Sequence, residues 1–188
     1  MTVDPNSVAS DWLAACSAAL EGSSVDAVTQ LMLPEGWLRD LLVFTWDVRA
    51  LAGREKIASY LANTLAPARI TDVKVNNAPH YCPTVVPVPQ MAGAPSVEFA
   101  FTFECKNGHG RAHARLLPDT DGVWRAFTLL FEVSDLRGHE ELATLPLRDD
   151  VTGVPGRDMQ QEFKDYVEEI ESKPYVLIGK SSRSSQDA

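Results

Sequence analysis

The strongest constraint in this sequence is a long alternation of side chains over residues 96–117. In SVEFAFTFEC, every second position is taken by Val97, Phe99, Phe101, Phe103 or Cys105. Side chains two residues apart point to the same face of a strand, so this pattern predicts one apolar and one polar face. The Asn107-Gly108 pair that follows is typical of a hairpin turn, and HGRAHARLL reads as the returning strand. The sequence therefore predicts an antiparallel hairpin with one buried face.

Three helical segments precede this hairpin. Apolar residues recur at helical spacing over residues 8–19, 25–32 and 57–65. Asn6 or Ser7 is a candidate N-cap of the first segment, because a side-chain oxygen there can accept from the free amides of the first turn. We expect the first two segments to form a hairpin of short helices.

The remaining segments indicate how the chain closes. Residues 36–53 fit either a short helical turn or a buried strand, and residues 43–48 favour extended chain. Period-two patterns predict strands over residues 70–75 and 123–133, and the Pro-rich residues 80–95 predict a long loop or an edge strand. Helices followed by antiparallel strands define an α+β fold. We expect three N-terminal helices packed on a curved antiparallel sheet, forming a cone whose mouth can hold a small molecule.

Charge and composition limit the location and the partners. Of the 188 residues, 17 are basic and 26 acidic, and the resulting charge of −9 disfavours nucleic acid and anionic membranes as partners. The sequence has neither a signal-peptide pattern nor an apolar run near the ~18–20 residues of a membrane span. Its three widely spaced cysteines indicate a reducing, cytoplasmic location without a zinc site. We expect residues 1–145 to form the domain, and residues 146–188 a linker, an amphipathic helix over 159–171 and a disordered tail.

Three sequence blocks carry a family resemblance. GWLRDLLVFTWDVRALAGREKI, GRAHARLLPDTDGVWRAFTLLFE and LRGHEE resemble the N-terminal domain of fungal flavin-containing monooxygenase-like proteins, and the order of elements resembles the NTF2-like (SnoaL-like) cone. The likeness covers residues 8–145. In that family a Gly-rich Rossmann turn follows the linker, whereas here PYVLIG leads into KSSRSS and only Gly179 of the pattern remains. We therefore expect no FAD, NAD or other cofactor.

The candidate catalytic residues are Arg39, Glu132 and His113. Arg39 lies in apolar surroundings, where it either points into the cone and holds an oxyanion or forms a structural ion pair with Asp40. By strand alternation Glu132 shares a face with Trp124, and a carboxyl in this apolar strand end should have a raised pKa and suit proton transfer. Alternatively, Glu132 is exposed at the rim. His113 is a candidate pocket acid or hydrogen-bond donor.

Further residues are candidates for substrate binding, and each has a structural alternative. Asp47 is either a pocket base or a partner of the backbone and Arg49, and His109 either binds substrate or lies on a solvated sheet face. Phe101 and its neighbours are mostly core, although some can line a pocket with Trp124. The two histidines lack a carboxylate at metal-ligand spacing, so no metal is expected. The full set of substrate-binding candidates is Asp40, Trp46, Asp47, Phe101, His109 and Trp124.

The resemblance extends to the cofactor-free isomerases and cyclases of fungal secondary metabolism, including semi-pinacolases of indole alkaloid pathways. It implies an isomerase that steers a semi-pinacol-type rearrangement of an oxidised alkaloid intermediate, after a separate flavin monooxygenase. The alternatives are a non-catalytic ligand-binding or interaction module derived from such a monooxygenase, and a hydratase or epoxide hydrolase. We also expect a homodimer, because one side of the last strand would be an apolar outer face made of Val123, Phe127, Leu129 and Phe131.

Overall fold

The structure is a computed structural model of the chain, and it describes residues 3–88, 94–141 and 159–172. The chain divides into two compact units, Met1–Arg137 and Gly138–Ala188, which are described separately. The expected boundary between residues 145 and 146, the expected linker before residue 159 and the expected tail beyond residue 172 lie outside the described residues.

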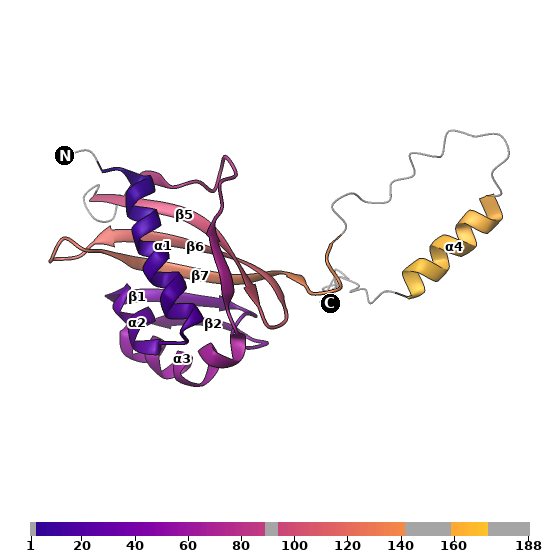
Figure 1. The fold of residues 1–188 in the computed structure, drawn as a ribbon, viewed down its shortest axis with the longest axis horizontal. Coiled ribbons are helices and arrows are strands. Elements are labelled where there is room, and N and C mark those ends of the chain that lie inside the picture. The colour runs from indigo at the N-terminus through magenta and orange to yellow at the C-terminus, as the bar shows by residue number, and fades with distance from the viewer. Residues whose placement is uncertain (1–2, 89–93, 142–158, 173–188) are drawn as a thin grey trace, which may run out of the picture. The chain divides into compact units, whose positions relative to one another are not determined.

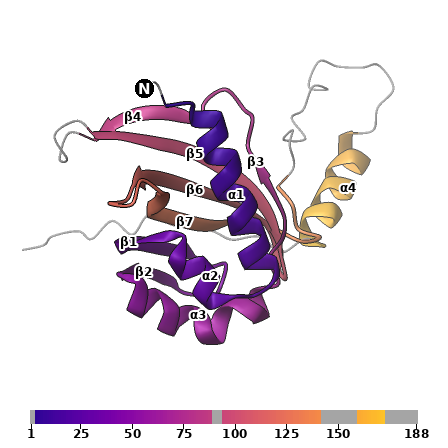
Figure 2. The same cartoon turned by 60° about the vertical axis from the view of Figure 1, so that its left-hand side comes forward.

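The first unit contains helices α1 (Pro5–Glu21), α2 (Val25–Gln30) and α3 (Arg54–Ala68). Its strands are β1 (Met32–Leu41), β2 (Val48–Ala52), β3 (Thr71–Val75), β4 (Thr84–Val88), β5 (Ala94–Cys105), β6 (Gly108–Pro118) and β7 (Trp124–Leu136). They form one sheet in the order β2-β1-β7-β6-β5-β3, and β4 also pairs with β5 (Figure 1). Helix α1 crosses one face, and α2 and α3 lie at the β1–β2 end of the sheet (Figure 2). We call the face under α1 the covered face and the opposite one the open face.

The strand pairing confirms the predicted hairpin and corrects one expectation. Phe101 on β5 pairs with Ala112 on β6, and the hairpin closes with Cys105 opposite Gly108. The sheet is not antiparallel throughout, because β1 runs parallel to β7. Alternation within a segment shows that it is a strand but not which distant strand it will join. Of the ambiguous residues 36–53, those up to Leu41 end β1 and Val48–Ala52 form β2, and these two strands pair antiparallel. Residues 43–47, which were expected to be extended, instead belong to the bent loop between the two strands.

The helix ends follow local capping rules. Asp4, rather than Asn6 or Ser7, caps α1: its Oδ1 accepts the Asn6 amide at 3.0 Å, and Pro5 takes the first helical position. Ser24 caps α2, as its position before the apolar stripe indicates. The local signals therefore locate both helix starts to within a few residues.

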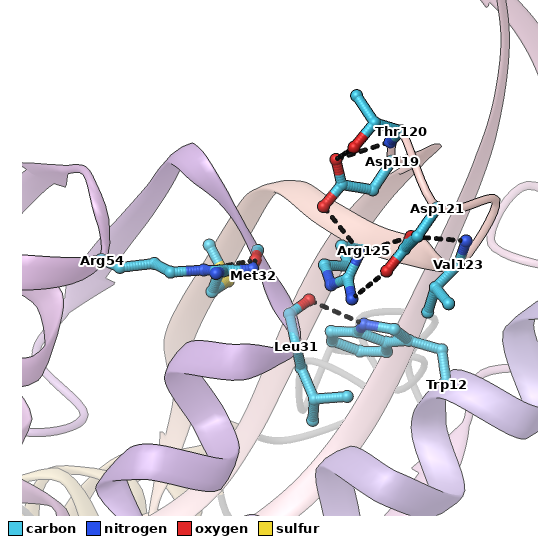
Figure 3. Close-up of polar contacts among 9 residues, drawn as sticks. All are labelled: Trp12, Leu31, Met32, Arg54, Asp119, Thr120, Asp121, Val123 and Arg125. Carbon is cyan, nitrogen blue, oxygen red and sulfur yellow. Dashed lines mark hydrogen bonds and ion pairs between the residues drawn. The ribbon is translucent and has the colours of Figure 1, made fainter.

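Polar contacts fix the helices to the start of the sheet (Figure 3). Nε1 of Trp12 on α1 donates to the carbonyl oxygen of Leu31 at 3.1 Å. The guanidinium of Arg54, at the start of α3, donates to the carbonyl oxygen of Met32. The Ala126 amide of β7 also donates to Leu31, at 2.8 Å. The junction of α2 and β1 is thus held by α1, α3 and β7 together.

The second unit contains α4 (Met159–Glu171), which confirms the predicted C-terminal helix. The side chains of Phe163, Tyr166 and Ile170 are exposed on it. In the described ranges, no helix is both long and apolar enough to span a membrane.

Candidate functional site

Aromatic rings fill the interior of the cone. Phe131 on β7 makes edge contacts with three rings, at centroid distances of 5.2 Å from Phe44, 5.5 Å from Phe103 and 6.0 Å from Phe101. All four side chains are buried. Gly110 makes this packing possible, because the Phe103 ring occupies the space that a Cβ at Gly110 would need. The predicted substrate-binding residue Phe101 is therefore placed in the core, the alternative that its strand pattern favoured.

Asp40 is a fully buried carboxylate at the edge of this core. Its Oδ1 accepts the amides of Val43 at 2.8 Å and Phe44 at 3.2 Å. Its Oδ2 accepts the Thr45 amide at 3.3 Å and the Tyr60 hydroxyl at 2.7 Å. Each oxygen thus has two protein donors, which offsets the cost of burying the charge. Asp40 holds the loop between β1 and β2, and the structure gives it no opening toward a substrate.

Tyr60 on α3 completes this polar cluster, and sequence analysis missed its role because it treated residues 57–65 as an apolar helix face. Its hydroxyl lies 3.0 Å from Oγ1 of Thr45 as well as near Asp40. Desolvation, with the neighbouring Asp40 charge, raises the pKa of Tyr60 to about 12. Tyr60 is therefore a neutral donor at physiological pH. The signal available in the sequence was the hydroxyl itself, which needs a partner when the ring is packed against a core.

Arg39 lies outside the cone. Arg39 and Asp40 are consecutive residues of β1, so their side chains point to opposite faces. Asp40 is buried, whereas Arg39 is exposed on the open face. The expectation that Arg39 points into the cone is therefore wrong, and so is the alternative of an Arg39–Asp40 ion pair. Across the described residues, no carboxylate pairs with Arg39.

A β-bulge separates Glu132 from the core. The β6–β7 ladder shifts register between Arg115 and Leu116, which leaves Phe127 as the extra residue of β7. Trp124, before the bulge, packs against the core, while Glu132, after it, lies on the open face. An inserted residue reverses the alternation beyond it. The expectation that Trp124 and Glu132 share a face of the strand is therefore wrong.

Glu132 is engaged by a neighbouring cation. Nε of Arg111 donates to its Oε2 at 3.2 Å, and Nη2 donates to its Oε1 at 3.0 Å. The Glu132 side chain is 31% exposed, and its hydrogen bonds raise the pKa of Arg111. The apolar surroundings expected for this carboxyl are thus replaced by a two-point ion pair.

The strand register nevertheless brings the three candidate catalytic residues together. Arg39, Leu130 and His113 are direct neighbours in one row across β1, β7 and β6. Glu132 and Arg111 stand in the next row. Directly paired residues share a face, so all five lie on the open face of the sheet, outside the cone.

The histidines belong to the same polar surface. His113 is 42% exposed, and its Nε2 lies 3.8 Å from Glu98. Partial burial lowers the pKa of His113, against the opposing effect of Glu98. His109 Nδ1 lies 2.7 Å from Glu104, and Arg115 binds Glu98 at 2.7 Å. Sequence analysis did not single out the two glutamates, although they alternate on the polar face of residues 96–105, opposite this basic strand.

The loop after Asp40 presents the remaining candidates to solvent. Trp46 is 64% exposed. Asp47 accepts the Val48 amide at 2.8 Å and pairs with Arg49 at 2.6 Å. Asp47 therefore has the structural contacts that were the alternative to a pocket base.

Two hollows occur on the surface of the first unit. One, of about 460 Å³, is a shallow groove between α1 and β3 that includes Ser10, Ser17 and Lys74. The other, of about 270 Å³, is lined by open-face residues such as Glu104 and His109 and by Gly110. This second hollow also borders Phe103, one of the four packed rings. Among the described side chains, no group of three histidine, cysteine or acidic residues has the arrangement of a metal site.

Comparison with known proteins identifies the fold. No family model matches the sequence, and no curated protein matches it either. A ketosteroid isomerase-like protein from Erwinia carotovora atroseptica is similar in structure, with a TM-score of 0.53 and 12% identity over 70% of this chain and 97% of that one. An uncharacterised protein with a cystatin-like fold from Caulobacter vibrioides gives a TM-score of 0.51 and 12% identity over 69% and 89%. These two likenesses show the fold alone.

Nuclear transport factor 2 from Cryptosporidium parvum aligns with a TM-score of 0.48 and 14% identity, over 70% of this chain and 98% of that one. The α+β fold that the sequence predicted, with helices packed on a curved sheet, is the fold of this chain, and it is shared with the ketosteroid isomerase-like structure.

Proposed function

We propose that this chain is a non-catalytic interaction module that acts through the outer surface of its cone, and that its partner is a second copy of the chain. The aromatic packing around Phe131 is the observation that carries the proposal. A catalyst of this fold class would need an interior space with an unengaged acid, base or oxyanion donor. Asp40 has all its acceptor positions engaged by the protein.

The outer surface has the character of a self-complementary interface. Arg39 stands on β1 between Trp37 and Leu41, and Trp and Arg are the residues that interface centres favour. Glutamates and arginines alternate on neighbouring strands of the same face. A mixed surface of this kind suits a two-fold contact, in which each patch meets its own copy.

The sequence predicted a dimer from an apolar outer face on the last strand, and the expectation of that face is wrong. Leu129 and Phe131 are buried in the core, so they do not belong to an outer surface. The support for a dimer comes instead from Arg39 and its exposed neighbours on β1. Sedimentation equilibrium over a micromolar concentration series tests the proposal, which expects reversible dimerisation. A monomer at every concentration would overturn it.

A second candidate function rests on the fold. The likeness to a ketosteroid isomerase-like protein supports a cofactor-independent isomerase or cyclase of the SnoaL-like type. The finer form, a semi-pinacol-type rearrangement of an oxidised indole alkaloid after a separate flavin monooxygenase, is supported by sequence resemblance only. Incubation of the chain with an oxidised indole, followed by chiral chromatography, decides between the two. The interaction module gives no acceleration over buffer, whereas an isomerase gives turnover of the indole.

A further inference from the structure

The sheet has three strands with a free edge in the described residues, and two of them are protected. In β3 the register shifts next to Asp72, which has a positive φ of 54°. In β4, Pro87 removes one backbone donor. Bulges and prolines on an edge hinder the addition of a further strand.

Strand β2 carries neither form of protection. Its sequence VRALA has no proline, and its register with β1 is unbroken from Val48 to Ala52. Its first three residues are exposed. An exposed and regular edge strand is a template for pairing with another strand, so β2 is the edge of this sheet that can accept one.

Large apolar side chains surround this edge. Trp37, at 48% exposed, lies opposite Ala52 in the β1–β2 ladder, and Val48 is 52% exposed. Trp46 and Leu42 are exposed in the adjoining loop. Asp40 holds the backbone of this loop, so Trp46 is attached to a rigid segment. Less conformational entropy is then lost when a partner binds.

We propose that β2 pairs antiparallel with β2 of a second copy, in a register centred on Val48. Asp47 is the last loop residue before β2, and Val48 and Arg49 are the first two residues of the strand. In this register each Asp47 would face the partner's Arg49, and each Val48 would face its own copy. Within one chain the two charges already lie 2.6 Å apart, with more than half of each side chain exposed. Opposite charges directly across an antiparallel pair stabilise it, and like charges destabilise it.

This inference rests on the self-association proposed above and can fail independently of it. The test uses the full chain carrying Asp47→Arg or Arg49→Asp. Either variant alone places like charges opposite each other, so we expect its dimer dissociation constant to rise by about tenfold or more. An equimolar mixture of the two variants restores opposite charges at both positions. The mixture should therefore form a heterodimer with a dissociation constant within about threefold of the wild-type value.

A matched control is available on a protected edge. Lys74 and Asp72 on β3 form an ion pair of the same spacing at 2.7 Å. Lys74→Asp should leave the dimer unchanged, and circular dichroism checks that all variants are folded. Wild-type chain that stays monomeric refutes both this inference and the proposed function. Wild-type dimers that persist in both single variants, or a mixture that fails to associate, refute the β2 pairing alone.

Discussion

Replacing Asp40 with alanine should unfold the chain more readily than any change on the open face. The substitution removes the acceptor of three loop amides and of the Tyr60 hydroxyl. Hydrogen bonds to a charged group contribute about 1.5–3 kcal/mol each, but deletions at one site do not add. We therefore expect a loss of about 3–5 kcal/mol in the free energy of unfolding, near the upper end for single substitutions.

Urea unfolding followed by far-ultraviolet circular dichroism measures this loss. Tyr60→Phe provides a graded comparison, because it removes one of the four donors and leaves the other three. We expect it to cost about 1 kcal/mol. If Asp40→Ala costs less than about 1 kcal/mol, Asp40 does not hold the loop. If Tyr60→Phe costs as much as Asp40→Ala, the three loop amides contribute nothing, and the role of Asp40 in holding the loop is also contradicted.

Three further predictions concern pH and packing. Because the pKa of Tyr60 is raised to about 12 from 10, its contribution to stability is complete below pH 10 and is lost as the pH rises toward 12. The urea midpoint of the wild-type chain should therefore fall between pH 10 and pH 12, and Tyr60→Phe should make this fall smaller. Arg125 lowers the pKa of Asp121 to about 2 (Figure 3). The contribution of the Asp121–Arg125 pair to stability is therefore present above about pH 4 and is lost as the pH falls toward 2. The destabilisation caused by Asp121→Asn should accordingly be measurable at pH 5 and disappear near pH 2. Gly110→Ala forces the Phe103 ring to move and should cost about 1–3 kcal/mol in urea unfolding, whereas a neutral effect would contradict the described packing.

The fold was predictable because its signals are local. The alternation of residues 96–105, the Asn107-Gly108 turn and the capping residue Ser24 each specify a nearby piece of backbone. The parallel pairing of β1 with β7 depends on contacts between residues far apart in the sequence. No local pattern contains that information.

The site was predictable only in part, for two physical reasons. First, β1 has large apolar residues on both faces, such as Trp37 and Leu38, so alternation does not show which face is buried. Asp40 is buried because the loop and Tyr60 supply its donors. Second, the bulge at Phe127 reverses the side chains beyond it, and a single inserted residue leaves no sequence signature. Arg39, His113 and Glu132 were assigned to the interior of the cone, whereas they lie on the open face of the sheet.

The central structural claim is that packed aromatic rings close the cone, and this packing supports the proposal that the outer surface carries the function. A ¹H–¹⁵N chemical-shift titration of the chain with a tricyclic indole tests it most directly. We expect no saturable shifts at the amides of Phe99, Phe101 and Phe131, whose rings are buried in contact with one another or with neighbouring rings. Saturable shifts centred on these three residues would mean that the interior opens to a ligand, and a closed cone would then be contradicted.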